Sequence, residues 1–135
     1  MQNFEQIRAH VTANYAVRSS DPYLIGLDIS LDQGTRRQSV FLTELEGDDN
    51  RTYLRFSTSI APITGLDARR ALYFNWEQRL GHLAVSELDG VPYLQLCENR
   101  PLESLTASEI DRIIIEIAGL GDRMERTFSA GGDLF

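Results

Sequence analysis

The stretch TASEIDRIIIEIAGLGDRMERTF, residues 106–128, carries the strongest structural signal in the chain. Thr106 followed three positions later by Glu109 is the pattern of a helix capping box, and Leu105 with Ile110 fits the hydrophobic staple that accompanies one. Apolar residues then recur every three or four positions, which predicts one amphipathic helix with a single buried stripe. The residues of that stripe are Ile110, Ile113, Ile114, Ile117, Gly121, Met124 and Phe128.

Upstream of this helix, three segments alternate apolar and polar residues with a period of two, which is typical of strands with one buried face. They cover residues 25–31, 38–45 and 52–57. Gln33-Gly34 and the polar run 46–50 separate them and have the composition of turns. These segments predict three antiparallel strands in a meander.

Along the sequence, helices are predicted both before and after this meander. Phe4, Ile7, Val11 and Tyr15 form one stripe of a helix over residues 4–15, and the run before Pro22 ends that element.

Asp67 is placed to cap a second, short helix that starts at Ala68. From Gly81 the two-residue period returns, and Asp89-Gly90 predicts a hairpin turn before a strand over 93–97.

The predicted order is therefore α-β-β-β-α-β-β-α, an α+β fold with helices packed around an antiparallel sheet. The chain has 135 residues, of which 42% are apolar, a length and composition that fit one domain with its own core. We expect a single domain over residues 1–128 and a flexible tail over 129–135.

The charge and hydropathy of the chain indicate which partners and which cellular location to expect. Twenty acidic and thirteen basic residues give a net charge of −7, which disfavours nucleic acid as a partner. No apolar run is long enough to span a bilayer, and residues 1–17 lack the apolar segment of a signal peptide. We therefore expect a cytoplasmic protein that is not bound to a membrane.

Residues able to do chemistry are sparse. His82 and Cys97 lie on consecutive predicted strands, so a nucleophile and its base are conceivable there, but a small buried cysteine is the better interpretation. No set of residues has the spacing of a metal site or of a nucleotide-binding loop. We expect no catalytic residue, no metal and no cofactor, and hence a protein that is not an enzyme.

The aromatic residues of the second helix leave two interpretations open. Tyr73, Phe74 and Trp76 fall within four positions, and a single helix cannot turn all three towards one core. Either the helix is packed on two sides within the monomer, or a second copy of the chain covers one side as a dimer interface.

The element order and several stretches resemble the class I type III secretion chaperones and the related YbjN family of bacterial proteins. Ala71-Leu72-Tyr73-Phe74-Asn75 looks like the end of that family's second helix, and Gly81–Val85 with Asp89-Gly90 looks like the next strand and turn. Tyr93–Leu96 and then Arg100–Thr106 resemble the strand and loop that lead into its last helix.

The resemblance implies a homodimeric, non-enzymatic chaperone that holds an extended or unfolded segment of a partner polypeptide, such as a secretion effector. It implies binding along the sheet and the first helix, so Phe4, Ile7, Val11, Tyr15 and Ile25 are the candidate partner-binding residues. The same helix stripe equally suits packing on the chain's own sheet. A YbjN-like regulatory or stress-linked role without a secretion client is the alternative.

Overall fold

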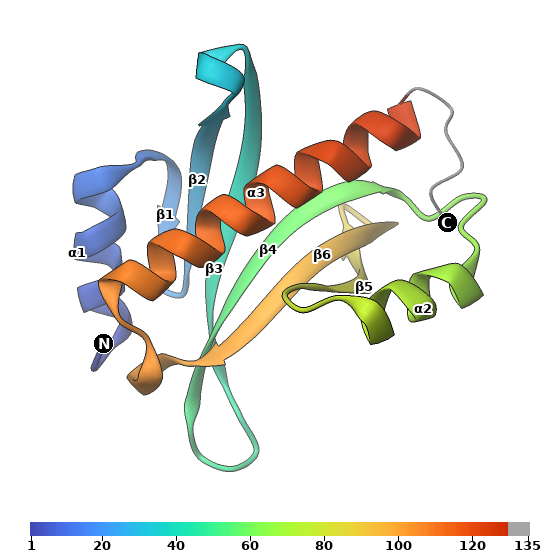
Figure 1. Cartoon of the computed structure of the whole chain (residues 1–135). Helices are drawn as coiled ribbons and strands as arrows, with labels where there is room; N and C mark the ends of the chain where they lie inside the picture. Colours follow the sequence, from blue (N-terminus) through green and yellow to red (C-terminus); the bar gives the residue numbers. More distant parts are fainter. Residues whose placement is uncertain (130–135) are drawn as a thin grey trace.

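The computed structural model describes residues 1–129, which form one antiparallel sheet of six strands and three α-helices (Figure 1). The helices are α1 (Phe4–Asn14), α2 (Ala68–Glu77) and α3 (Ala107–Ser129). The strands are β1 (Ala16–Asp21), β2 (Leu24–Leu31), β3 (Arg36–Glu46), β4 (Thr52–Pro62), β5 (His82–Leu88) and β6 (Val91–Pro101). They lie side by side in the order β1-β2-β3-β4-β6-β5.

The structure confirms the predicted α+β class and adds one strand to the predicted order. No strand was predicted between the first helix and Pro22, where the run before the proline was expected only to end the helix. Residues 16–21 form β1, which pairs with β2 at the edge of the sheet. An edge strand without a buried face shows no apolar–polar alternation, and β1 also carries a register shift between Val17 and Ser19. The period of two on which strand prediction rests is therefore missing here.

The core lies between α3 and one face of the sheet, and α3 crosses the strands along its whole length (Figure 1). Strands β2, β3, β4 and β6 contribute alternate, mostly apolar side chains to this face, whereas β5 contributes Leu83. Most of the predicted α3 stripe is buried against them, with Ile110, Ile113, Ile114 and Ile117 fully inaccessible. Burying one such side chain contributes roughly 1.5–3 kcal/mol, so this layer dominates the stability of the fold.

The start of α3 has half of the predicted capping box. The Glu109 backbone N–H donates to Thr106 Oγ1 over 3.1 Å, and the staple residues Leu105 and Ile110 are both buried. The Glu109 carboxylate does not reach back to Thr106. It accepts instead from the guanidinium groups of Arg100 on β6 (3.1 Å) and Arg112 on α3 (2.6 Å).

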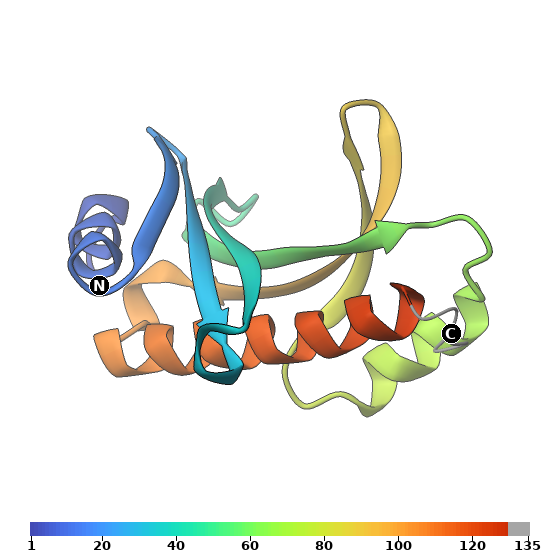
Figure 2. The same cartoon turned by 90° about the horizontal axis from the view of Figure 1, so that it is seen from above.

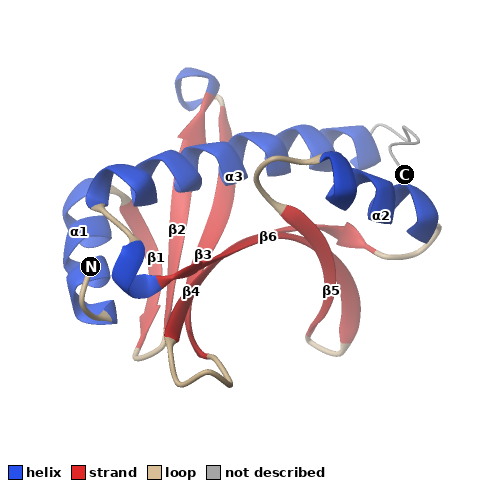
Figure 3. Ribbon diagram, turned by 60° about the horizontal axis from the view of Figure 1, so that its bottom comes forward, coloured by secondary structure: helices blue, strands red, loops and turns tan. Residues whose placement is uncertain are grey.

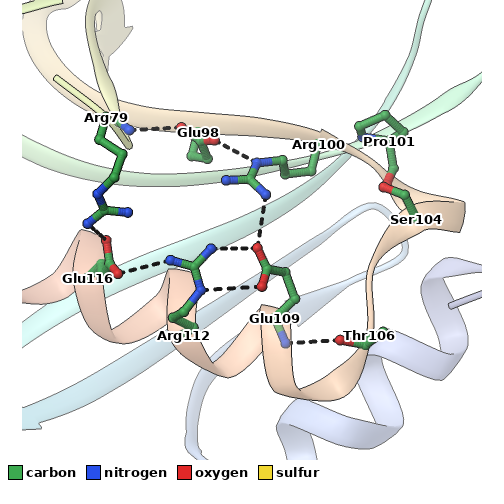
Figure 4. Close-up of polar contacts among 10 residues, drawn as sticks. Arg79, Glu98, Arg100, Pro101, Ser104, Thr106, Glu109, Arg112 and Glu116 are labelled. Carbon is green, nitrogen blue, oxygen red and sulfur yellow. Dashed lines mark hydrogen bonds and ion pairs between the residues drawn. The ribbon is translucent and has the colours of Figure 1, made fainter. Parts of the chain in front are cut away.

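These contacts belong to a chain of alternating charges that joins α3 to β6 and to the segment before β5 (Figure 4). Arg112 also pairs with Glu116, which pairs in turn with Arg79 in the segment before β5. At the other end Arg100 pairs with Glu98 over 2.6 Å, and the second carboxylate oxygen of Glu98 accepts from a backbone N–H. The network fixes the lateral position of α3 on the sheet, whereas burial of the apolar stripe supplies most of the free energy that holds the helix there.

The hairpin turn at Asp89-Gly90 is confirmed. Leu88 faces Val91 across a two-residue loop, and both loop residues have positive φ, as a tight hairpin turn requires. Two strands are longer than the predicted segments: β6 extends from Val91 to Pro101, and β4 continues past Ser57 to Pro62.

The C-terminal segment 129–135, expected to be flexible, lies outside the described residues except for Ser129, with which α3 ends. In the described part of the chain, none of the helices has the length and apolar character that crossing a bilayer requires.

Two glycines of α3, Gly121 and Gly119, differ in the space around them, so substituting each one tests how closely this helix approaches the sheet. A Cβ at Gly121 would lie 2.4 Å from Cγ2 of Thr58, which is fully buried and hydrogen-bonded through its hydroxyl to Gln38 and Ser39. A Cβ at Gly119 meets only the end of the Arg123 side chain, at 3.5 Å.

We predict that Gly121→Ala lowers the free energy of unfolding by about 1–3 kcal/mol through overpacking. Gly119→Ala is the matched control and should raise it by up to about 1 kcal/mol through helix propensity. Urea denaturation of both variants measures the difference. Stabilisation by both substitutions would show that α3 does not approach β4 this closely.

Candidate functional site

The stripe of α1, a candidate partner-binding surface in the sequence, belongs to the core. Phe4, Ile7 and Val11 are buried, as is Ile25 on β2, and only Tyr15 keeps part of its surface exposed. A side chain without exposed surface cannot contact a partner while α1 is docked. In the structure these four residues pack the helix on the chain's own sheet, the alternative that the sequence left open.

A polar cluster fastens the end of α1 to α3. Asp111 Oδ1 accepts from the Tyr15 hydroxyl over 2.6 Å and lies 2.8 Å from His10 Nε2, whose side chain is mostly buried. Partial burial alone would raise the pKa of Asp111, but the hydrogen bonds from Tyr15 and His10 outweigh it and lower that pKa. Burial and the Asp111 carboxylate together raise the pKa of Tyr15. The ionised carboxylate is thus part of the docking of α1.

The second helix presents an apolar face to solvent. Leu72, Tyr73 and Trp76 are 68%, 54% and 86% exposed and, with Arg69, line a shallow hollow. Phe74, expected at this interface, is half-buried and packs against the core. Leu72 points outward, because its neighbour Ala71 occupies the buried position.

Asn75 fixes α2 beside the sheet by imitating a neighbouring strand. Its Nδ2 donates to the Leu83 carbonyl over 3.1 Å, and its Oδ1 accepts from the Leu83 N–H over 2.6 Å. Both outward-facing backbone groups of Leu83 on the edge strand β5 are therefore satisfied. Asn75 thus holds the apolar face of α2 next to the β5 edge of the sheet. It covers only the first part of that edge strand.

The face of the sheet opposite α3 is open and hollowed. The β5–β6 hairpin extends away from α3 and curves over this side of β4 (Figures 2 and 3). Between the hairpin and strands β2 to β4 lies a cavity of about 430 Å³, lined by both apolar and polar side chains. The lining includes Phe41, Arg55, Ser57, Val85 and Gln95. Sequence reasoning missed this surface, although Phe41 among the small polar residues of these strands was a signal for it.

His82 and Cys97 face each other across β5 and β6 and line the same cavity, as their strand positions suggested. Burial raises the pKa of the Cys97 thiol, against a smaller opposing effect of Arg55, so the neutral, weakly nucleophilic form is favoured. Within residues 1–129, no three or more His, Cys, Asp and Glu side chains are grouped as metal ligands would be.

Comparison with solved structures shows which known fold this architecture has. No family model matches the chain, and no curated protein matches its sequence. Among solved structures, a chain of the ExsC–ExsE complex superposes with a TM-score of 0.64 at 18% identity, covering 93% of this chain and 96% of that one. A chain of the complex between the Yersinia pestis type III secretion chaperone SycH and a stable fragment of YscM2 gives 0.57 at 11%, covering 89% and 97%. The chain has the type III secretion chaperone fold.

The same fold is found in YbjN from E. coli, described as a candidate transcription regulator. Its TM-score is 0.58 at 10% identity, with 96% of this chain and 93% of that one covered. The fold that the sequence resemblance implied is thus confirmed over most of the chain. The fold therefore occurs both in a secretion chaperone solved with a fragment of another protein and in YbjN, which is described as a candidate regulator.

Removing the charge of Asp111 should loosen α1 in a pH-dependent way. Because the pKa of Asp111 is lower in the folded chain, its ionised form stabilises the fold above about pH 4, and this contribution is lost as the pH falls through the folded-state value. We predict that Asp111→Asn lowers the melting temperature at neutral pH and that the difference from wild type vanishes in acid. Asp48→Asn in an exposed turn is the control and should change neither value. An Asp111→Asn deficit that is equal at both pH values would contradict this role.

Proposed function

We propose that the chain is a non-enzymatic binding protein of the bacterial cytoplasm that acts as a homodimer and holds a segment of a partner polypeptide, as a chaperone does. The observation that carries this proposal is the pair of uncovered surfaces, the apolar face of α2 and the hollow face of the sheet, on the type III secretion chaperone fold. Two of the similar structures are complexes of such a chain with another protein.

The two surfaces suit different occupants. The α2 face carries large apolar side chains within five positions of one short helix, with the Arg69 guanidinium 5.9 Å from the centroid of the Tyr73 ring. Exposed aromatic side chains rimmed by arginine are typical of interface cores, and a patch on a straight helix can pack on its own copy about a two-fold axis. The sheet face is hollow rather than flat, which suits an inserted segment better than a second folded copy.

A YbjN-like regulatory role without a secretion client is the second candidate. It is supported by the similarity to YbjN, which extends over nearly the whole of both chains. The two candidates share the dimer and differ in the partner, so only the identity of a bound polypeptide separates them.

The dimer is tested by its mass in solution. We expect light scattering to give about 30 kDa, twice the chain mass of 15.3 kDa. Leu72→Asp combined with Trp76→Asp should give a folded monomer, because two carboxylates cannot be buried unpaired in an interface. Tyr23→Asp, which alters an equally exposed residue in the β1–β2 turn, should remain dimeric. A wild-type monomer at tens of micromolar would contradict the proposed interface.

Partner binding is tested by co-expression with the products of the adjacent genes. The proposal predicts that one of them co-purifies in a fixed ratio and is soluble only in the presence of this chain. If each neighbouring product is soluble alone and none is retained, the chaperone function is contradicted and the regulatory candidate takes its place.

A further inference from the structure

The hollow face of the sheet carries a charge opposite to that of the whole chain. The 430 Å³ cavity continues into a second one of about 320 Å³, with Phe41, Ser59 and Leu88 lining both, and we call the two together the sheet groove. Arg18, Arg37 and Arg55 line this groove, whereas Glu125 is its one acidic lining residue within the described part of the chain. The chain as a whole has twenty acidic against thirteen basic residues. Positive charge is thus concentrated where the sheet is hollow.

Two of these arginine charges are available to a ligand. Arg37 is exposed and makes no ion pair with any described residue. Arg55 donates from Nε to the amide oxygen of Asn99 over 3.0 Å, a contact that does not neutralise its charge. Arg18 differs, since Asp28 lies 4.0 Å away and the Ser39 hydroxyl accepts from it over 2.7 Å. The groove therefore keeps uncompensated positive charge, which attracts carboxylates.

The remaining lining suits a peptide. The Phe41 ring lies over Gly26, so close that a Cβ at that glycine would be 3.0 Å from the ring. Because Gly26 has no side chain, the ring can pack on its backbone and form the apolar floor of the groove. Gln95 is buried, and its Oε1 accepts from the Ser59 hydroxyl over 3.1 Å, while its Nε2 has no acceptor among residues 1–129. Since no buried side-chain N or O atom among residues 1–129 lacks a partner, this Nε2 is accessible from the groove. An accessible donor beside an apolar floor matches the carbonyl groups and side chains of a polypeptide segment.

We propose that the sheet groove binds a segment of the partner polypeptide in which apolar side chains stand next to aspartate or glutamate. The apolar side chains pack on Phe41, and the carboxylates pair with Arg37 and Arg55. The inference rests on the proposed function and adds the place and the chemistry of binding. It makes the binding salt-dependent and selective for acidic segments, although the protein itself is acidic.

Labelled peptides measure this selectivity directly. The probe is a fluorescein-labelled peptide GELEFELEG, compared with GQLQFQLQG and GKLKFKLKG in which only the charge differs, and binding is followed by fluorescence anisotropy. We expect the acidic peptide to bind wild type at least about tenfold more tightly than the neutral one, and more weakly as salt is raised. The basic peptide should bind least.

Three variants locate the binding. Arg37→Glu reverses a groove charge, and Ser57→Tyr fills the groove without changing charge; each should weaken the acidic peptide by about fivefold or more. Arg123→Glu on the exposed side of α3 makes the same charge change outside the groove and should leave affinity within about twofold. Circular dichroism and melting temperature confirm that each variant is folded.

The outcomes separate this inference from the proposed function. Equal binding of the three peptides, no binding of the acidic one, or unchanged affinity in both Arg37→Glu and Ser57→Tyr would overturn the sheet groove as the site. If a co-expressed partner binds wild type and those two variants alike, the chaperone function stands and the groove assignment falls. Loss of that partner in both groove variants, but not in Arg123→Glu, supports both.

Discussion

The packing of α3 on one face of the sheet is the constraint on which the rest of the structure depends. Ile113 and Ile117 at the centre of the helix have no exposed surface, and Gly121 permits contact with β4 where a methyl group would collide with Thr58. Because a helix of this length covers all the central strands, one layer of side chains closes the core. The ion pairs from Arg79 to Glu98 set the position of the helix and contribute less to its stability.

Covering one face leaves the molecule with one open face and two sheet edges. At the β1 edge, Arg8 of α1 donates to the carbonyls of Asp21, the last residue of the strand, and of Pro22 after it. At the β5 edge, Asn75 occupies both backbone groups of Leu83. Each edge is thus partly covered by a helix, which limits uncontrolled strand pairing. The surfaces left uncovered are the outer side of α2 and the sheet groove, and they differ in character: the first is aromatic and only shallowly hollowed, and the second carries positive charge.

Sequence patterns predicted those parts of the fold whose residues repeat with a regular period. The α3 stripe, the Asp67 cap and the Asp89-Gly90 turn were all readable, because each depends on neighbours along the chain. Strand β1 was missed, since an edge strand with both faces exposed has no period. The candidate site was predicted only in part: Tyr73 and Trp76 are exposed, but Phe74 is half-buried against the core and Leu72 is exposed beside Tyr73, because the sequence pattern did not settle the rotation of this short helix. The groove escaped prediction because it combines residues from all six strands, which only the sheet order brings together.

The central claim, that α3 covers one face of the sheet and leaves the other available, is tested most directly by NMR with a soluble paramagnetic probe. In the free protein, the side-chain signals of Phe41, Val85 and Leu88 should broaden strongly, whereas the methyl signals of Ile113, Ile114 and Ile117 should not change. Protection of Phe41 to the same degree as the α3 isoleucines would contradict the account, because it would mean that this face of the sheet is already covered.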